Sequence, residues 1–171
     1  MTDVLDSASR LLSTTAARWQ SLVETAPEEL LQRRPAPGEW SAADCLNHLL
    51  LTERVVFGGR LRAILEGRDL VTFDPKGPRA PDSERSSREM AKALAAERGE
   101  NLAVLRGLTP ADLERSSRHP EYGMVSLRVV LNTWAAHDLQ HTVQAEEALM
   151  QAFLPDTGPF RFRFADHEVS T

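Results

Sequence analysis

The sequence contains only one cysteine, Cys45, among its 171 residues. A single thiol excludes an internal disulfide and any zinc finger built from cysteines, and it suits a reducing compartment, so we expect a cytoplasmic protein. The chain also lacks a basic segment followed by an apolar one near its start, and no apolar stretch reaches the ~20 residues that span a bilayer. We therefore expect neither export nor a membrane as partner.

Long runs of one charge sign are absent as well. The 20 lysines and arginines are outnumbered by 25 aspartates and glutamates, which gives a formal net charge of −5. Proteins that bind nucleic acid gather positive charge to neutralise phosphates. The sequence therefore predicts no nucleic acid as partner.

What is present is an ordinary globular composition, with 42% hydrophobic and 26% charged residues. A chain of this length buries roughly 70% of its unfolded surface, so its core needs neither a disulfide nor a metal ion. Any metal would serve function. We expect one helical bundle domain over residues 1–150, followed by a tail over residues 151–171.

Four segments repeat apolar residues every three to four positions, which is the spacing of amphipathic helices and predicts an all-α bundle. The first ends before Pro27, and the spacing of Thr25 and Glu28 fits a capping box that opens a short helical turn over residues 28–32. Capping signals also mark the later helix starts. They are Ser41 with Asp44, Ser86 with Glu89, Thr109 with Asp112, and Ser126; the second helix should end near Glu66 and the fourth near Met150.

Two stretches do not continue the helical pattern. Residues 67–82 contain three prolines and two glycines, and a connection of this length predicts a crossover or a loop over a site, anchored by Phe73. In the tail, Phe160, Phe162 and Phe164 alternate with arginines, which is the period of an extended strand. We expect an extended tail that lays its phenylalanines on the bundle; a segment exchanged with a partner subunit is the alternative.

Three histidines interrupt the apolar stripes of the second and fourth helices. His137 and His141 lie four residues apart, so their side chains leave one helix face ~5–6 Å from each other. His48 lies on the inward stripe of the second helix. Bundle metal sites are built in the core from facing helices, so the three imidazoles could supply three nitrogen ligands to one ion. The competing interpretation is a set of hydrogen-bonded core histidines, and the HxxxH pair lacks a metalloprotease glutamate.

The segments WSAADCLNHLLLTE, HPEYGMVSL and HDLQHTVQ, in this order and spacing, resemble the DinB/YfiT-like superfamily of four-helix bundle proteins. The resemblance extends from the first helix to about Met150 and leaves the tail unmatched. It implies a four-helix up-down-down-up bundle with a long crossover loop and a divalent metal ion, usually zinc or nickel. It also implies that the three ligands of this ion are His48, His137 and His141.

Three neutral imidazoles would leave the full dipositive charge on the ion, so a water in a fourth position would be acidified toward a pKa of ~7 on zinc. The same position could take a thiolate or a substrate carboxylate. Some superfamily members are similar to thiol transferases or isomerases that use a low-molecular-weight thiol. We therefore expect a metal-dependent hydrolase or thiol S-transferase that has a small-molecule substrate and forms a homodimer. The alternative is a non-catalytic, metal-binding, stress-associated bundle that acts through a homodimer or another partner interface.

Two polar residues near the histidines each have two interpretations. Asp44, one turn before His48, either caps the helix or orients the His48 ring. Gln144, near His141 on the fourth helix, either hydrogen-bonds a metal-bound water or substrate or is a surface polar group. Cys45 is interpreted as a small buried hydrophobe.

The remaining polar residues are expected away from the site. Glu97 and Asn101 are interpreted as a solvated face of the third helix, with polar groups presented to the pocket as the alternative. Asp138 is interpreted as facing another helix or water. His119, in a loop, and His167, in the tail, are expected to be exposed.

Overall fold

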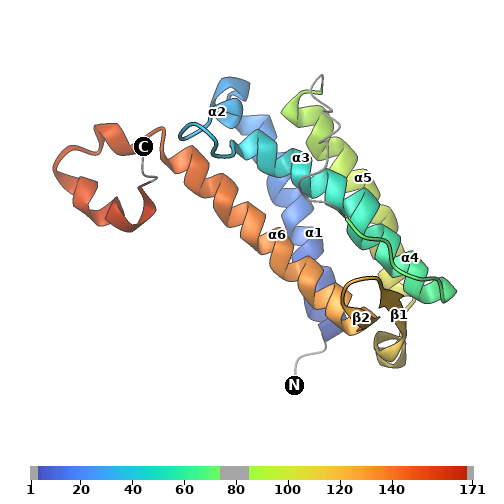
Figure 1. Cartoon of the computed structure of the whole chain (residues 1–171). Helices are drawn as coiled ribbons and strands as arrows, with labels where there is room; N and C mark the ends of the chain where they lie inside the picture. Colours follow the sequence, from blue (N-terminus) through green and yellow to red (C-terminus); the bar gives the residue numbers. More distant parts are fainter. Residues whose placement is uncertain (1–3, 74–84, 169–171) are drawn as a thin grey trace.

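The structure is a computed structural model that describes residues 4–73 and 85–168. Within these ranges the helical prediction is confirmed, because four long helical segments form a bundle (Figure 1). They are α1 (Val4–Thr25), α3 (Ala42–Thr52) with its continuation α4 (Gly58–Glu66), α5 (Ser87–Arg106) and α6 (Leu127–Met150). Shorter elements are the helix α2 (Glu28–Gln32), a 3-10 turn (Pro110–Glu114) and the strands β1 (Ser116–His119) and β2 (Gly123–Ser126). No described helix combines the length and apolar character that crossing a membrane requires.

The helices begin at the predicted caps. In the two capping boxes that begin with serine, the hydroxyl accepts from the backbone N–H three residues later, and the acid at that position accepts from the serine N–H. These boxes pair Ser41 with Asp44 and Ser86 with Glu89, while Ser126 caps α6. The predicted box of Thr109 and Asp112 is also present. Local hydrogen bonding therefore sets where each long helix enters the bundle.

The capping box predicted at Thr25 and Glu28 is wrong. The Thr25 hydroxyl donates to the carbonyl of Ser21 one turn earlier, so it stays within α1. The short helix α2 starts after Pro27 without a side-chain cap. A threonine inside a helix end commonly bonds back to the preceding turn in this way, which removes it from the next helix start.

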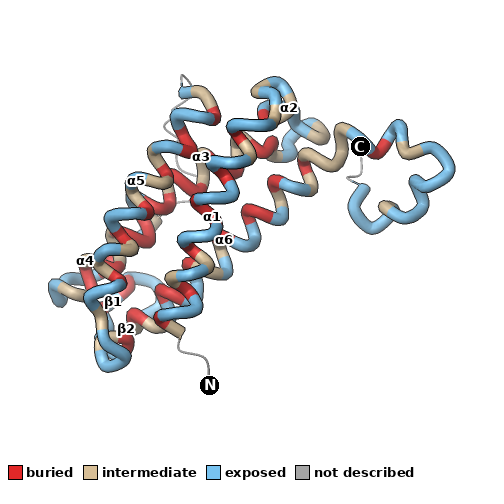
Figure 2. The backbone as a smooth tube through the Cα atoms, turned by 180° about the vertical axis from the view of Figure 1, so that it is seen from behind, coloured by how far each residue is buried: buried red, intermediate tan, exposed pale blue. Residues whose placement is uncertain are grey.

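Two apolar clusters fill the bundle, and a layer of polar side chains lies between them. One cluster includes Leu12, Leu61 and Trp134, and the other includes Trp19 and Leu46. Buried residues recur along each long helix (Figure 2). The buried polar residues of the bundle's middle are Thr15, Thr52, Glu53, Arg98, Asn101, Asp138, His141 and Thr142.

A π-helical turn, Glu53–Phe57, joins α3 to α4 where the sequence predicts one uninterrupted α-helix. The backbone N–H of Gly58 bonds to the carbonyl of Glu53, five residues back. Such a turn accommodates one extra residue, and it changes which residues face inward after it. Glu53, Val56 and Phe57 are all buried here.

The HPEYG stretch, predicted only to break the helical pattern, forms an antiparallel hairpin. His119 pairs with Gly123 across a three-residue loop. Gly123 has a φ of 71°, the left-handed conformation that closes such loops. The hairpin thereby returns the chain directly to the start of α6.

The long connection after α4 begins beside this hairpin. The backbone N–H of Leu70 donates to the carbonyl of Arg118 at 2.8 Å, and Phe73 packs against the apolar cluster as predicted. The part of the predicted crossover with Pro75, Gly77, Pro78 and Pro81 lies outside the described residues.

The prediction of an extended tail is wrong for the described residues. The tail forms 3-10 turns at Leu154–Asp156 and Gly158–His167, and it loops away from the end of α6 (Figure 1). Phe160 and Phe162 are 59% and 72% exposed, so they do not pack on the bundle. The guanidinium of Arg163 lies over both rings, at 6.0 and 5.7 Å from their centroids, and this local contact competes with the extended arrangement.

Candidate metal centre

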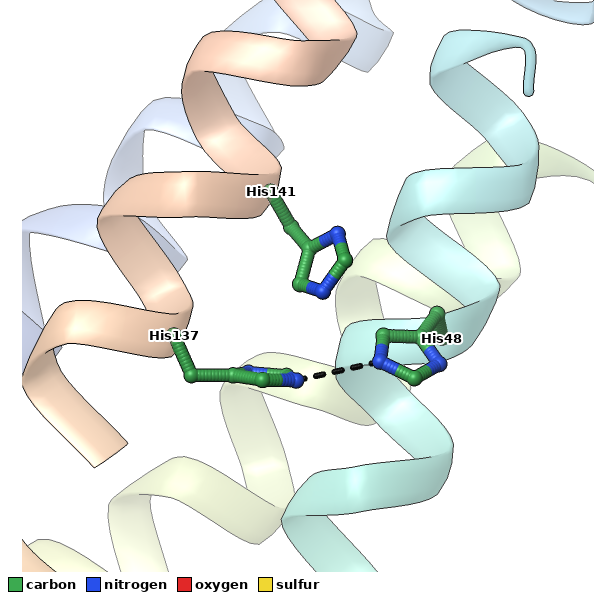
Figure 3. Close-up of side chains that lie close together, drawn as sticks. All are labelled: His48, His137 and His141. Atoms are coloured by element: carbon green, nitrogen blue, oxygen red, sulfur yellow. Dashed lines mark hydrogen bonds between the residues drawn. The ribbon is translucent and has the colours of Figure 1, made fainter. Parts of the chain in front are cut away.

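Three histidines from two facing helices converge in the middle of the bundle (Figure 3). His48 comes from α3, and His137 and His141 come from successive turns of α6. One ring nitrogen of each lies within 4.8 Å of the other two, and the Nε2 atoms of His48 and His137 are 3.0 Å apart. Two nitrogens that bind one zinc ion at tetrahedral angles lie about 3.3 Å apart, so this spacing fits a shared ion. The structure therefore brings together the three histidines that the sequence singles out.

Aromatic side chains enclose the cluster on two sides. Trp40 stacks on His141 at a centroid separation of 5.6 Å and an interplanar angle of 17°. Phe57, buried at the end of the π-helical turn, meets the edge of His137 at 5.1 Å. Neither wall was predicted from the sequence. The signals at Trp40 were its position directly before the cap of α3 and its place at the start of the segment WSAADCLNHLLLTE.

The environment of His137 and His141 favours neutral rings. Burial, followed by the neighbouring charges of His141, His48 and Arg98, lowers the pKa of His137 to about 3. Burial also lowers the pKa of His141, although the hydrogen bond that His141 donates to Gln144 opposes this. A neutral imidazole keeps the lone pair that binds a metal ion.

Gln144 and Asp44 have different roles in the structure. Nδ1 of His141 lies 2.9 Å from Oε1 of Gln144 and donates to it, which leaves the other ring nitrogen available to the cluster. Asp44 uses one carboxylate oxygen to cap Ser41 and the other to accept from Arg34 at 3.0 Å. The cap and the ion pair with Arg34 together occupy both oxygens of Asp44, which favours the capping interpretation.

A buried ionic cluster that the sequence did not predict lies between α5, α6 and the π-helical turn. The guanidinium of Arg98 donates to both oxygens of Glu53 and to both oxygens of Asp138, the neighbour of His137 in sequence. It also donates to the carbonyl of Leu12. The two carboxylates outweigh the effect of burial and raise the pKa of Arg98. The cluster joins α1, α5, α6 and the π-helical turn at the level of the histidines.

The prediction of a solvated face is wrong for Asn101, and Glu97 is only partly exposed. Asn101 is 1% exposed and donates to Glu53 at 2.8 Å. Glu97 pairs with Arg54 near the surface at 2.7 Å. The available signal was the spacing of Arg98 and Asn101 within the apolar stripe of α5, where a polar side chain must find a buried partner.

Cys45 is fully buried, and its thiol is not suited to bind a metal. Burial and, to a smaller extent, the charge of Asp44 raise the pKa of Cys45 to about 12. Because the thiolate is the form that ligates metals and attacks substrates, the interpretation as a small hydrophobe fits the structure.

A cavity of about 740 Å³ opens beside the three histidines. His119, predicted to be exposed, is 3% exposed and contributes to its wall; that prediction is wrong. The hairpin turns the His119 ring inward, where it stacks on Tyr122 at 4.7 Å. His167 is exposed, as predicted. Besides the histidines, the cavity is lined by Trp40, Thr52, Val56, Phe57, Arg60, Thr72, Phe73, Glu121, Tyr122 and Thr133.

The sequence pattern of the DinB superfamily matches residues 11–145. Among solved structures, a similar one is YfiT from Bacillus subtilis, described as a probable metal-dependent hydrolase with an unusual four-helix bundle topology. The TM-score is 0.75 at 21% sequence identity, and the match covers 86% of this chain and 87% of that one. At this identity the likeness establishes a shared fold. No curated protein matches the sequence significantly.

Proposed function

This chain belongs to the DinB superfamily, and from that premise we propose that it is a divalent-metal-dependent enzyme whose ion is held by His48, His137 and His141. The observation that carries the proposal is the convergence of three ring nitrogens within 4.8 Å of one another. The metal dependence ascribed to YfiT, which has the same fold, supports it. Zinc and nickel are the ions that we expect, because imidazole ligands suit both.

The reaction that we propose is hydrolysis or thiol S-transfer on a small molecule, with a low-molecular-weight thiol as one reactant of the second type. When bound, the ion supplies a Lewis acid and an acidified water or thiolate at its open position. Gln144 fixes the ring hydrogen of His141 on Nδ1. Trp40 and Phe57 shield the histidines from bulk water, and the adjoining cavity offers room for a substrate.

We also infer the up-down-down-up order of the four long helices. The two apolar clusters support it, because each gathers one end of every helix. The first holds Leu5, Leu61, Leu105 and Leu127, and the second holds Val23, Ala42, Met90 and Ala145.

The second candidate function is a non-catalytic, stress-associated metal-binding bundle that acts through a homodimer. Phe160 and Phe162 favour it, because large exposed apolar side chains commonly mark an interface. Removing the residues after Pro155 should convert such a dimer to a monomer in analytical ultracentrifugation. If the truncated protein still has the molar mass of two chains, the tail is excluded as the dimer contact.

Elemental analysis tests the metal proposal directly. Untagged protein, purified without chelator, should contain about one zinc or nickel ion per chain, and the His48→Ala variant should contain none. His167→Ala is the matched control, because it removes an exposed histidine of the tail and should keep the ion. Zinc and nickel contents far below one per chain in the wild-type protein would refute the proposal. Hydrolysis and thiol-transfer assays on the loaded protein then separate the two reaction types.

A further inference from the structure

One part of the cavity wall holds two hydrogen-bond donors side by side. Nη2 of Arg60, on α4, lies 3.4 Å from Nε2 of His119, on β1. The backbone N–H of Glu121 donates to Nδ1 of the same imidazole at 3.1 Å. Because Nδ1 is an acceptor, the ring hydrogen is on Nε2. Arg60 and His119 therefore present two N–H groups to each other, and neither can accept from the other.

No acceptor among residues 4–73 and 85–168 compensates Arg60. Its Nε is buried without a hydrogen-bond partner among the described residues, and none of their ion pairs includes Arg60. Burial also lowers the pKa of Arg60. A guanidinium partly withdrawn from water without an anion is unfavourable, since its donors lose the hydrogen bonds that water would give.

We propose that Arg60 and His119 bind the carboxylate of an elongated small molecule whose other end lies at the three histidines. An oxygen placed between the two donors accepts from both, and a guanidinium is the side chain best shaped to hold a carboxylate. This inference rests on the proposed function only in taking the cavity as the substrate site.

Charge and shape define the ligand further. A singly charged carboxylate balances the single charge of Arg60, whereas Glu121, which lines the same cavity, disfavours the second charge of a phosphate. Arg60 follows His48 by twelve residues, so their backbones lie roughly 18 Å apart along the helix axis. The two side chains cover part of that separation, and an elongated ligand spans the rest. Val56, Phe57 and Phe73 line the same cavity, and they suit an apolar spacer.

Titration calorimetry with octanoate tests the proposal on the full chain. Arg60→Gln should weaken octanoate binding about tenfold to hundredfold, the usual effect of losing a charged hydrogen-bond donor. Arg62→Gln is the matched control, because it removes the same charge from the same helix at a residue that does not line the cavity. His119→Phe keeps an aromatic ring and removes one donor, and it should weaken binding about threefold to tenfold. If circular dichroism shows that Arg60→Gln does not fold, His119→Phe alone tests the proposal.

Two further ligands and one further variant complete the test. Octanol should bind more weakly than octanoate, and Arg60→Gln should not change the affinity for octanol. Octyl phosphate should bind no more tightly than octanoate. Equal octanoate affinity in the wild type, Arg60→Gln and His119→Phe would overturn the proposal, and tighter binding of octyl phosphate would overturn its assignment to a carboxylate. The effect of Arg60→Gln should persist in a His48→Ala background. If the wild-type protein lacks metal, this result still supports the carboxylate site while the metal proposal fails.

Discussion

Arg98 and Glu53 form a bidentate ion pair in the centre of the bundle. Nε and Nη2 of the guanidinium each lie 2.9 Å from one carboxylate oxygen, and both side chains are 1% exposed. Glu53 also accepts from the indole N–H of Trp134 at 3.1 Å, and Arg98 reaches Asp138 beside His137. The pair thus connects α5 and the π-helical turn to the helix that carries two of the three histidines.

Replacing Arg98 by methionine should destabilise the protein severely. Glu53 and Asp138 would remain buried without a cation, and breaking a buried ion pair from one side costs about 3–5 kcal/mol of unfolding free energy. Urea denaturation measures the change. Arg10→Met is the control, because the pair of Arg10 with Asp6 is exposed and should contribute less than about 1 kcal/mol. Similar losses in both variants would show that the cluster is not the stabilising layer that its burial indicates.

Alanine substitution should have opposite effects at two helical glycines. A Cβ at Gly58 would lie 2.8 Å from the carbonyl oxygen of Glu53 and 2.9 Å from Nδ2 of Asn101, so it would distort the π-helical turn. A Cβ at Gly99, on α5, meets nothing within 4 Å. Gly99→Ala should therefore raise the unfolding free energy by about 0.5–1 kcal/mol, the usual gain in a helix, and Gly58→Ala should lower it. Thermal unfolding measures the stability of the two variants. A stabilised Gly58→Ala variant would contradict the close contact of Gly58 with Glu53 and Asn101.

Gln144→Leu should weaken zinc binding while the fold stays intact. The side chain loses the oxygen that holds the Nδ1 hydrogen of His141, and such supporting bonds typically contribute about 10–100-fold to metal affinity. Competition with a chromophoric chelator measures the affinity. Gln140→Leu makes the same exchange at an exposed position one turn earlier and should leave the affinity unchanged. Equal affinities would mean that Gln144 has no part in orienting the ring.

Cys45 should resist thiol reagents until the protein unfolds. With its pKa raised from 9.0 to about 12, almost no thiolate exists at pH 8, and the side chain is fully buried. Between these two values the unfolded chain releases a proton that the folded chain keeps, so stability falls as pH rises from about 9 toward 12. This contribution is fully present below pH 9. Denaturation across this range should show a smaller decline for Cys45→Ala, and a native thiol that reacts rapidly at pH 8 would contradict the burial.

The helices and the histidine cluster could be predicted because their signals are local. Apolar spacing gives the inner face of each helix, and capping residues such as Ser41 and Ser86 give the starts. Two histidines four residues apart share a helix face wherever the helix lies. His48 needed one further assumption, that its own inward stripe faces α6.

The remaining features depend on contacts between segments that are distant in sequence. The acceptors of Arg98 come from α6, the π-helical turn and α1, and no local pattern identifies them. The π-helical turn places Gly58 so close to Asn101 of α5 that a Cβ would not fit between them. His119 is buried only because its hairpin folds beside α4. In the tail, alternating phenylalanines indicated a strand, but local turns and the stacking of Arg163 prevailed.

The separation of the histidines along the chain also bears on how the protein folds. The paired nitrogens of His48 and His137 belong to residues 89 positions apart, so the site forms only after α6 has docked against α3. Contacts of such long range form late, because closing the intervening loop must come first. A chain cut before α6 keeps only His48 of the three, and a full chain arrested before this step holds His48 apart from His137 and His141. Tight metal retention would then indicate that the bundle has assembled completely. A bound ion would also slow unfolding, because α3 and α6 could separate only after the ion is released.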